Sequence, residues 1–277
     1  MINKIVLSHK LIGRFLIGLV IVTSVSACSN FFSIKPARVT GHELSGSSKS
    51  RLLAMIQQKS NDIKSFKALA RVEVIYRDRN SSLRYGLLAE RPNFFRIEGL
   101  PLNGSYSLSV LTAYADRLQL VDHTNKTVTF GPLSRSSLEA LLQIPADPNE
   151  LIDYLAGVVP ALTSTQLSKD LRVFFDPELK KYYLMSSDML NFWQIDSLSL
   201  RLEKAQFKQA DQLEPFLEIS YEHGQQDPKN LEFVIPDKDL KIKLQYQIVN
   251  TNSKIRSFSF NVPVPEGYKL RALEVTD

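Results

Sequence analysis

Apolar and polar residues alternate over many stretches of this chain, and this period of two limits the possible folds more than any other feature. In the clearest stretch, 240–248, five apolar residues are separated by two lysines and two glutamines. Successive side chains of a β-strand point to opposite faces, so each such stretch predicts a strand with one apolar face. We predict about ten strands, drawn from the segments 68–76, 83–90, 93–97, 106–110, 118–122, 127–130, 171–175, 182–185, 198–203, 217–222, 240–248 and 258–262.

Three short helical patterns interrupt the strands. The first, 51–60, has Ser50 as its predicted N-cap. Ser136 and Glu139 predict a capping box at the second, and the third begins at Asp147. Helices of this length are marginal alone, so we expect them to lie on the apolar face of the sheet. The predicted fold is mainly β (α+β): a curved antiparallel half-barrel of about ten strands covered by a lid of short helices.

The N-terminus has the pattern of a secretion signal. Basic residues precede an apolar run, 15–25, that is too short to cross a bilayer comfortably. The run leads to Val-Ser-Ala-Cys, which resembles the bacterial lipobox and implies that Cys28 becomes an acylated first residue, carrying chains such as palmitate. An ordinary signal peptide with an accidental cysteine is the alternative. We therefore expect a lipoprotein signal peptide at 1–27, an acylated N-terminus with a flexible tether at 28–50, and one half-barrel domain at 51–277.

Composition and charge argue against several other functions. The net charge is +5, and three basic residues belong to the predicted signal peptide, which leaves about +2 and argues against nucleic-acid binding. Cys28 is the only cysteine, so burial alone must stabilise the fold. The chain has no zinc-protease, Gly-x-Ser-x-Gly or phosphate-loop motif, and His42, His123 and His223 share no ligand spacing. We expect no enzyme, no catalytic residue, no metal and no cofactor apart from the acyl chains on Cys28.

Four short motifs resemble the LolA/LolB family of lipoprotein carriers and receptors of the bacterial envelope. The segment 91–95, Arg-Pro-Asn-Phe-Phe, resembles a strand opening in the carrier branch, LolA. The segment 100–104, Leu-Pro-Leu-Asn-Gly, resembles the protruding loop of the receptor branch, LolB, with Asn103 as an extra residue. The segments 121–126 and 150–160 resemble the hairpin after that loop and a helix ending in Leu-Gly-x-Pro.

The resemblance to the receptor branch implies a function at the outer membrane. Such a receptor accepts lipoproteins from a soluble periplasmic carrier of the LolA type and helps insert them into the membrane. The implied partners are outer-membrane lipid, acylated lipoproteins and that carrier, and we expect a monomer that is lipid-anchored on the periplasmic face of the outer membrane. Two alternatives stay open: a carrier of another envelope amphiphile, such as a glycolipid or lipopolysaccharide component, and a structural lipoprotein that binds nothing.

The resemblance assigns roles to three residues. Leu100 and Leu102 flank a turn and are expected to form a membrane-insertion loop, with the alternative that Leu102 folds back onto its own sheet. Arg91 is expected to contact the lid, because a guanidinium has five donors that suit the carbonyl groups at helix ends. The alternative for Arg91 is a solvated arginine at a strand edge.

The apolar positions of the strands and helices are expected to line a cavity for acyl chains. A sixteen-carbon chain that leaves water gains on the order of 12 kcal/mol, and an apolar concavity can supply that environment. A plain packed core requires the same residue types, so the sequence leaves both possibilities open. The predicted lining residues are Val72, Val74, Leu87, Phe95, Ile97, Leu108, Leu138, Leu141, Leu151, Ile152, Leu155, Leu244 and Tyr246.

Overall fold

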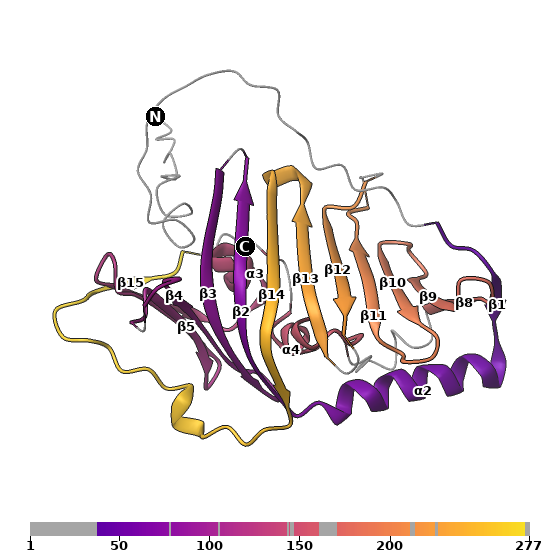
Figure 1. The fold of residues 1–277 in the computed structure, drawn as a ribbon, viewed down its shortest axis with the longest axis horizontal. Helices are drawn as coiled ribbons and strands as arrows, with labels where there is room; N and C mark the ends of the chain where they lie inside the picture. The colour runs from indigo at the N-terminus through magenta and orange to yellow at the C-terminus, as the bar shows by residue number, and fades with distance from the viewer. Residues whose placement is uncertain are drawn as a thin grey trace, which may run out of the picture.

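The computed structural model describes residues 38–77, 79–104, 106–142, 144, 147–160, 171–210, 214–224 and 227–274. The predicted signal peptide and Cys28 lie outside these residues. Figure 1 shows one curved sheet accompanied by α2 (Gly46–Asp62), α3 (Arg135–Leu142) and α4 (Pro148–Ala156). Two short 3-10 helices, η1 (Pro236–Lys238) and η2 (Ser257–Ser259), also belong to the described part.

All fifteen described strands belong to a single sheet. In chain order they are β1 (His42–Leu44), β2 (Ser65–Tyr76), β3 (Arg79–Glu90), β4 (Phe94–Leu100), β5 (Ser109–Tyr114), β6 (Arg117–Asp122), β7 (Thr127–Pro132), β8 (Leu171–Asp176), β9 (Lys181–Ser186), β10 (Asn191–Asp196), β11 (Leu202–Phe207), β12 (Leu217–His223), β13 (Pro228–Ile235), β14 (Leu240–Thr251) and β15 (Lys269–Ala272). Across the sheet the order is β1-β8-β9-β10-β11-β12-β13-β14-β2-β3-β4-β5-β6-β7-β15.

The sheet is open, because β1 and β15 form its two ends. Consecutive partners run antiparallel, except that β15 runs parallel to β7. The predicted fold, a mainly β curved sheet with few helices, is confirmed, although the sheet has more strands than the ten expected. None of the helices in the described part of the chain combines the length and the apolar character that a membrane span requires.

The main core lies between the helices and one face of the sheet, which we call the inner face. On β2 every second residue from Ala68 to Val74 is buried, as the alternation predicts. On β14 the same pattern runs to Tyr246, where a register shift ends it and leaves Ile248 exposed. Apolar residues of α2, α3 and α4 belong to the same buried cluster, so the helices cover the inner face.

The strand predicted at 198–203 is wrong in its first half. Residues 197–199 form a turn in which the Asp196 carboxylate accepts hydrogen bonds from the backbone N–H and the hydroxyl of Ser199, each at 2.7 Å. Leu198 is 82% exposed at the tip of this turn, and β11 starts only at Leu202. A local side-chain hydrogen bond therefore overrides the alternation of leucines.

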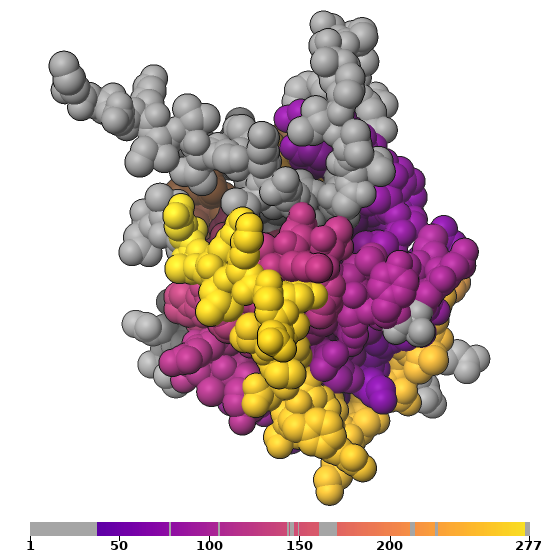
Figure 2. All heavy atoms as spheres, turned by 90° about the vertical axis from the view of Figure 1, so that its left-hand side faces the viewer, coloured from indigo at the N-terminus to yellow at the C-terminus, as the bar shows by residue number. Residues whose placement is uncertain are grey.

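The strand predicted at 258–262 is also wrong. Residues 257–259 form η2, and the C-terminal segment 253–274 runs across the outer face of the sheet (Figure 2). There it contributes Val262 and Tyr268 to a second apolar cluster around three buried valines of β5, β6 and β7. The alternating phenylalanines thus belong to an irregular cover, in which Phe260 is buried and Phe258 is exposed.

The ordered structure begins before the predicted domain boundary at residue 51. Residues 42–44, within the predicted tether, form β1 and pair with β8. Helix α2 then begins at Gly46, and the Ser50 hydroxyl donates to the Gly46 carbonyl at 3.1 Å, so the prediction of Ser50 as an N-cap is wrong. The short polar residues of this segment indicate flexibility, but the pairing with β8 orders them.

The two shorter helices follow the prediction closely. Ser134, and not Ser136, caps α3, because its Oγ accepts a hydrogen bond from the Ser137 backbone N–H at 3.1 Å. Helix α4 begins at Pro148, directly after Asp147, as predicted. Both helices are therefore in the predicted places, with the start of α3 shifted by two residues.

Candidate functional site

An apolar cavity lies between the inner face of the sheet and the ends of α3 and α4. Its volume is about 80 Å³. By the same measure a single water molecule needs roughly 10–15 Å³. Six of the predicted lining residues surround it: Val72, Leu87, Ile97, Leu151, Leu155 and Leu244. Five residues that were not predicted complete the wall: Tyr85, Leu142, Ile144, Phe233 and Ile242.

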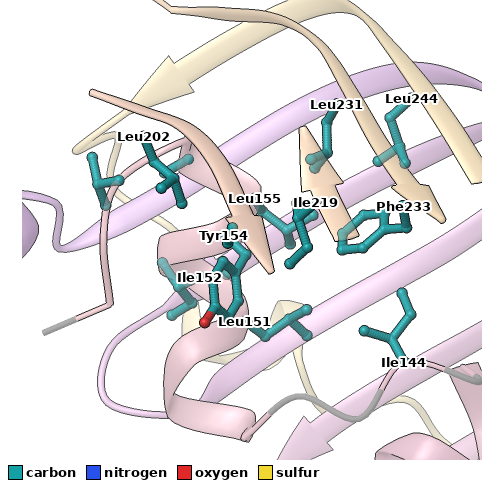
Figure 3. Packing of buried hydrophobic residues seen from close by; sticks show 14 of the residues in the cluster. Ile144, Leu151, Ile152, Tyr154, Leu155, Leu202, Ile219, Leu231, Phe233 and Leu244 are labelled. Carbon is teal, nitrogen blue, oxygen red and sulfur yellow. The ribbon is translucent and has the colours of Figure 1, made fainter. Parts of the chain in front are cut away.

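The wall of this cavity is almost entirely hydrocarbon. Figure 3 shows Leu151 and Leu155 pointing from α4 toward the strands that carry Phe233 and Leu244, with Ile144 beside them. Among the described lining residues only Tyr85 has a polar side-chain atom. Such a surface favours a hydrocarbon guest by about 0.8 kcal/mol for each buried methylene group, and it offers no group for acid–base chemistry at neutral pH.

The other predicted lining residues lie elsewhere. Val74, Phe95, Leu138, Ile152 and Tyr246 are buried in the main core without reaching the cavity, and Leu141 packs against that core from its margin. Leu108 is only half-buried and precedes β5. In β5 the odd-numbered Leu111 and Ala113 join the main core, while Val110 joins the outer cluster. The alternation at 106–110 therefore placed Leu108 on the wrong face.

Both faces of β5 are buried, and this is the reason for the misplacement of Leu108. The C-terminal segment covers the outer side of β5, so residues of either parity are buried there. The sequence signal that could have identified the missed residues is clearer. Tyr85 and Ile242 occupy the same alternating positions as their predicted neighbours Leu87 and Leu244.

Helix α4 is fixed to the sheet at its C-terminal end. The hydroxyl of Tyr221 donates to the Tyr154 carbonyl and that of Tyr246 to the Leu155 carbonyl, both at 2.9 Å. The Leu202 backbone N–H donates to the Gly157 carbonyl at 3.1 Å. Burial raises the pKa of both tyrosine hydroxyls, which therefore stay protonated donors. These bonds satisfy carbonyl groups that a helix end would otherwise leave unpaired, so α4 is a fixed cover.

Arg91 directly follows β3 and joins two helices. Its Nε donates to the Ile63 carbonyl at 2.8 Å, and its Nη2 donates to the carbonyl and hydroxyl of Ser60 at 3.1 Å each. The same Nη2 forms an ion pair with Asp153 of α4, a side chain that is 1% exposed, while the Arg91 side chain is 20% exposed. Ser60 also donates to Asp153 at 2.8 Å. Arg91 thus contacts the helical cover and is not a solvated edge arginine.

Asp153 is a site residue that the sequence reasoning missed. It lies between Ile152 and Tyr154 in a helix whose apolar stripe faces the core. A lone carboxylate in such a stripe is rarely left unpaired, which is the signal that could have been used. Its partner could not have been identified, because Arg91 is 62 residues away in the chain.

The loop between β4 and β5 carries the predicted insertion residues. Leu102 is 42% exposed in the turn, and the neighbouring Tyr106 is exposed as well. Leu100 is half-buried as the last residue of β4 and pairs with Arg84. The Arg84 guanidinium donates to the Gly104 carbonyl at 2.7 Å and so holds the far side of the turn. The loop therefore presents one leucine, Leu102, to the surroundings.

One carboxyl group in the first turn of α4, that of Glu150, has a pKa far from its ordinary value. Burial raises the pKa of Glu150 to about 7, and the nearby carboxylates of Asp147 and Asp153 add to the shift. Arg135 and a hydrogen bond with the Asp147 backbone act in the opposite direction.

Among the described residues, no group of three histidine, cysteine, aspartate or glutamate side chains could hold a metal ion.

Comparisons with known proteins give similarity in fold only. No protein-family model matches the chain, and no curated protein matches it. A solved DUF1329 family protein from Desulfovibrio piger has a TM-score of 0.51 at 7% identity, covering 77% of this chain and 95% of that one. At this identity the similarity shows a shared fold.

Two further solved structures are more loosely similar. A LolA superfamily protein from Nitrosomonas europaea has a TM-score of 0.47 at 12% identity, covering 75% of this chain and 96% of its own. A putative outer membrane lipoprotein-sorting protein domain from Vibrio parahaemolyticus has a TM-score of 0.46 at 12% identity, covering 77% and 97%. These two scores are too low to support an argument, so the arrangement of sheet, helices and cavity is the stronger guide to function.

Proposed function

We propose that this protein is an outer-membrane-anchored lipoprotein of the LolA/LolB type that binds acyl chains and helps insert other lipoproteins into the outer membrane. The observation that carries the proposal is the apolar cavity under α3 and α4. A structural lipoprotein needs no cavity between its sheet and its helical cover. The short motifs at 91–95 and 100–104 support the proposal, because Arg91 contacts α4 and Leu102 is exposed.

The size of the cavity limits how the guest is held. About 80 Å³ accommodates part of a hydrocarbon chain and not the several chains of a whole lipoprotein anchor. A chain that enters further would displace Leu142, the last residue of α3, and Ile144, because the C-terminal end of α4 is bonded to the sheet. Partial burial also makes the binding free energy of the guest smaller in the cavity than in a bilayer, so the guest can leave without an energy source.

Two different segments of the chain would serve anchoring and delivery: the N-terminus at Cys28 and the loop that carries Leu102. Acylation of Cys28 would hold the protein at the membrane, since two or more acyl chains give durable attachment. The exposed Leu102 would enter the lipid surface and lead the guest toward it. Neither step requires catalysis, and we propose binding and transfer in place of an enzymatic reaction.

A ligand-uptake measurement tests the proposed function. The chain with Cys28→Ala is titrated with a fluorescent fatty acyl probe, and saturable uptake is expected. Ile242→Phe, which fills the cavity from β14, should reduce uptake while the fold is retained. Ile75→Phe on β2 is the matched control, because Ile75 pairs with Lys241 and lies on the opposite face of the sheet. No saturable uptake by the parent chain would favour the structural lipoprotein and contradict the proposal.

The cargo is identified by a second experiment. Mass spectrometry of lipid that co-purifies with the Cys28→Ala chain should show lipoprotein acyl chains. A glycolipid or lipopolysaccharide component in their place would establish the carrier of another amphiphile. In cells, depletion of the protein should leave lipoproteins in the wrong membrane, and normal lipoprotein localisation after depletion would exclude the receptor role.

A further inference from the structure

Two arginines face each other across neighbouring strands on the outer face of the sheet. Arg71 of β2 lies directly opposite Arg84 of β3 in the register. Their neighbours Val72 and Tyr85 are buried in the main core, so both arginine side chains belong to the other, outer face. Arg71 is exposed and Arg84 is half-buried. Like charges directly opposite each other destabilise a sheet, so this pair calls for a reason.

The two charges lack a compensating partner. In the part of the chain that the structure describes, neither arginine belongs to an ion pair. Two glutamates of the same face are bonded elsewhere, since Glu73 accepts from Asn80 and Glu98 accepts from Arg96. A guanidinium has five donors, and the described hydrogen bonds of Arg84 use only Nη2. The pair can therefore still bind an anion.

The pair lies at the base of the loop that carries Leu102. Arg84 is opposite Leu100, the last residue of β4, and its Nη2 donates to the Gly104 carbonyl at 2.7 Å. A Cβ on Gly104 would lie 3.2 Å from Cε1 of Tyr106, so this exposed ring adjoins the same turn. The loop thus presents an exposed leucine and an exposed tyrosine beside two guanidinium groups.

This combination of side chains suits the layers of a membrane surface. An apolar side chain enters the hydrocarbon, tyrosine rings gather at the interface, and arginines attract anionic head groups. A guanidinium also matches the geometry of phosphate oxygens, to which it can donate two parallel hydrogen bonds. In a zwitterionic lipid the head group neutralises its own phosphate. Charge complementarity therefore favours an anionic phospholipid as the partner of the two arginines.

We propose that Arg71 and Arg84 bind the phosphate of an anionic phospholipid head group when Leu102 enters the membrane. This inference rests on the proposed function, because it names the lipid at which the loop delivers its guest. A phosphate between the two guanidinium groups compensates their repulsion, which explains why two like charges lie opposite each other. The loop accordingly binds an anionic membrane surface more tightly than a zwitterionic one.

Vesicle flotation of the Cys28→Ala chain tests this preference. Vesicles of phosphatidylcholine alone are compared with vesicles that also contain phosphatidylglycerol, and the parent chain should bind the second kind more tightly. Arg71→Gln should lower binding to the anionic vesicles about fivefold, the contribution of one basic residue near an anionic surface, and leave binding to phosphatidylcholine unchanged. Arg71→Lys keeps the charge and should lose less. Added salt should reduce the difference between the two kinds of vesicle.

Arg117→Gln is the matched control. Arg117 is also an exposed strand arginine without an ion pair among the described residues. It pairs with Tyr114 at the end of β5 that is remote from the loop. This variant should bind both kinds of vesicle as the parent does. A parent chain without preference for the anionic vesicles, or equal losses for the two glutamine variants, would refute the head-group contact.

Uptake of the fluorescent fatty acyl probe separates this inference from the proposed function. Arg71 lies on the face of the sheet opposite the cavity, so Arg71→Gln should take up the probe as the parent does. Parental uptake together with parental binding to the anionic vesicles would refute the head-group contact while acyl binding stands. If the parent chain shows no saturable uptake, the proposed function itself fails, and the vesicle comparison still decides the head-group contact.

Discussion

Asp153 is almost fully buried in α4, and its carboxylate is compensated by Arg91 and Ser60. Removing one partner of a buried ion pair leaves a charge without compensation, which is far more destabilising than replacing both partners. The same three side chains link the end of β3, the end of α2 and α4. At the scale of single residues, they decide how firmly the helical cover is attached beside the cavity.

We therefore expect Arg91→Met to lower the free energy of unfolding by about 2–4 kcal/mol. Asp153→Leu should cost less in the Arg91→Met background than alone, because the buried charge is then removed. Urea unfolding of the four chains of this double-mutant cycle gives the coupling energy. Arg172→Met is the control, since its ion pair with Glu43 lies on the surface, and its midpoint should stay near that of the parent. Additive effects of Arg91→Met and Asp153→Leu would contradict the prediction.

The raised pKa of Glu150 leads to a prediction of how the free energy of unfolding depends on pH. Its pKa is about 7 in the folded chain against 4.5 as the ordinary value. Between these values the folded chain holds a proton that the unfolded chain has released, so the free energy of unfolding falls as pH rises through this window. Glu150→Gln should flatten this slope and be more stable than the parent at pH 8 by about 1–3 kcal/mol. Urea midpoints from pH 5 to pH 8 provide the measurement, and identical slopes for both chains would refute the prediction.

Single residues were predictable only where a pattern or a motif marked them. Leu102 and Arg91 were identified through short motifs, and the structure exposes the first and bonds the second to α4. Asp153 and Tyr85 have no motif, and their importance arises from what lies opposite them in space. The unpaired hydroxyl of Tyr85 in particular is a property of its surroundings, which no stretch of sequence records.

At the scale of elements, alternation predicted the strands that are buried on one face only. It fails for β10, where the adjacent Phe192 and Trp193 are both buried, and for β5, which is covered on both sides. It also fails at 198–203, where a turn held by Asp196 contains an exposed leucine. The helices α3 and α4 were predictable because their start signals are local, although the cap of α3 is Ser134 and not the predicted Ser136. In each of these failures, either a contact between distant segments or a hydrogen bond within a turn overrides the alternation of apolar and polar residues.

The connection between β4 and β5 makes a testable element. Leu102→Glu should lower binding of the Cys28→Ala chain to phospholipid vesicles about tenfold, because burying one leucine gains roughly 1.5–3 kcal/mol. Leu198→Glu is the matched control, since Leu198 is also an exposed leucine in a turn. Vesicle flotation measures binding, and thermal unfolding shows that both variants stay folded. Equal losses for the two variants would mean that the 101–104 loop has no special role.

At the scale of the whole molecule, the sheet is covered on both sides by segments far apart in the chain. The helices cover the inner face, and the C-terminal segment 253–274 covers the outer face of β4–β7 (Figure 2). The half-barrel was predictable from the strand pattern and the resemblance. The outer cover was not, because its irregular backbone has no period. β15 also pairs with β7 and covers an edge that would otherwise be free to associate with another chain.

The outer cover depends on Phe260. Of the two phenylalanines in this short segment, Phe260 is buried and Phe258 is exposed. Phe260 is 1% exposed and its ring centroid lies 5.9 Å from that of Phe94, whereas Phe258 is 67% exposed. Phe260→Ala should cost about 3–5 kcal/mol and loosen the segment from the sheet, because it leaves a cavity under the cover. Phe258→Ala should change stability little.

Loosening the cover should also change the association state. The segment is held to the sheet by hydrogen bonds from Arg96 to the Ser259 carbonyl and from Gln119 to the Val262 carbonyl, at 3.1 and 2.9 Å. Once it lifts, the apolar outer face and the edge of β7 become available, so Phe260→Ala should self-associate where Phe258→Ala stays monomeric. Urea unfolding and sedimentation velocity measure the two effects. A monomeric Phe260→Ala variant of parental stability would show that the C-terminal segment is dispensable and that the sheet needs no outer cover.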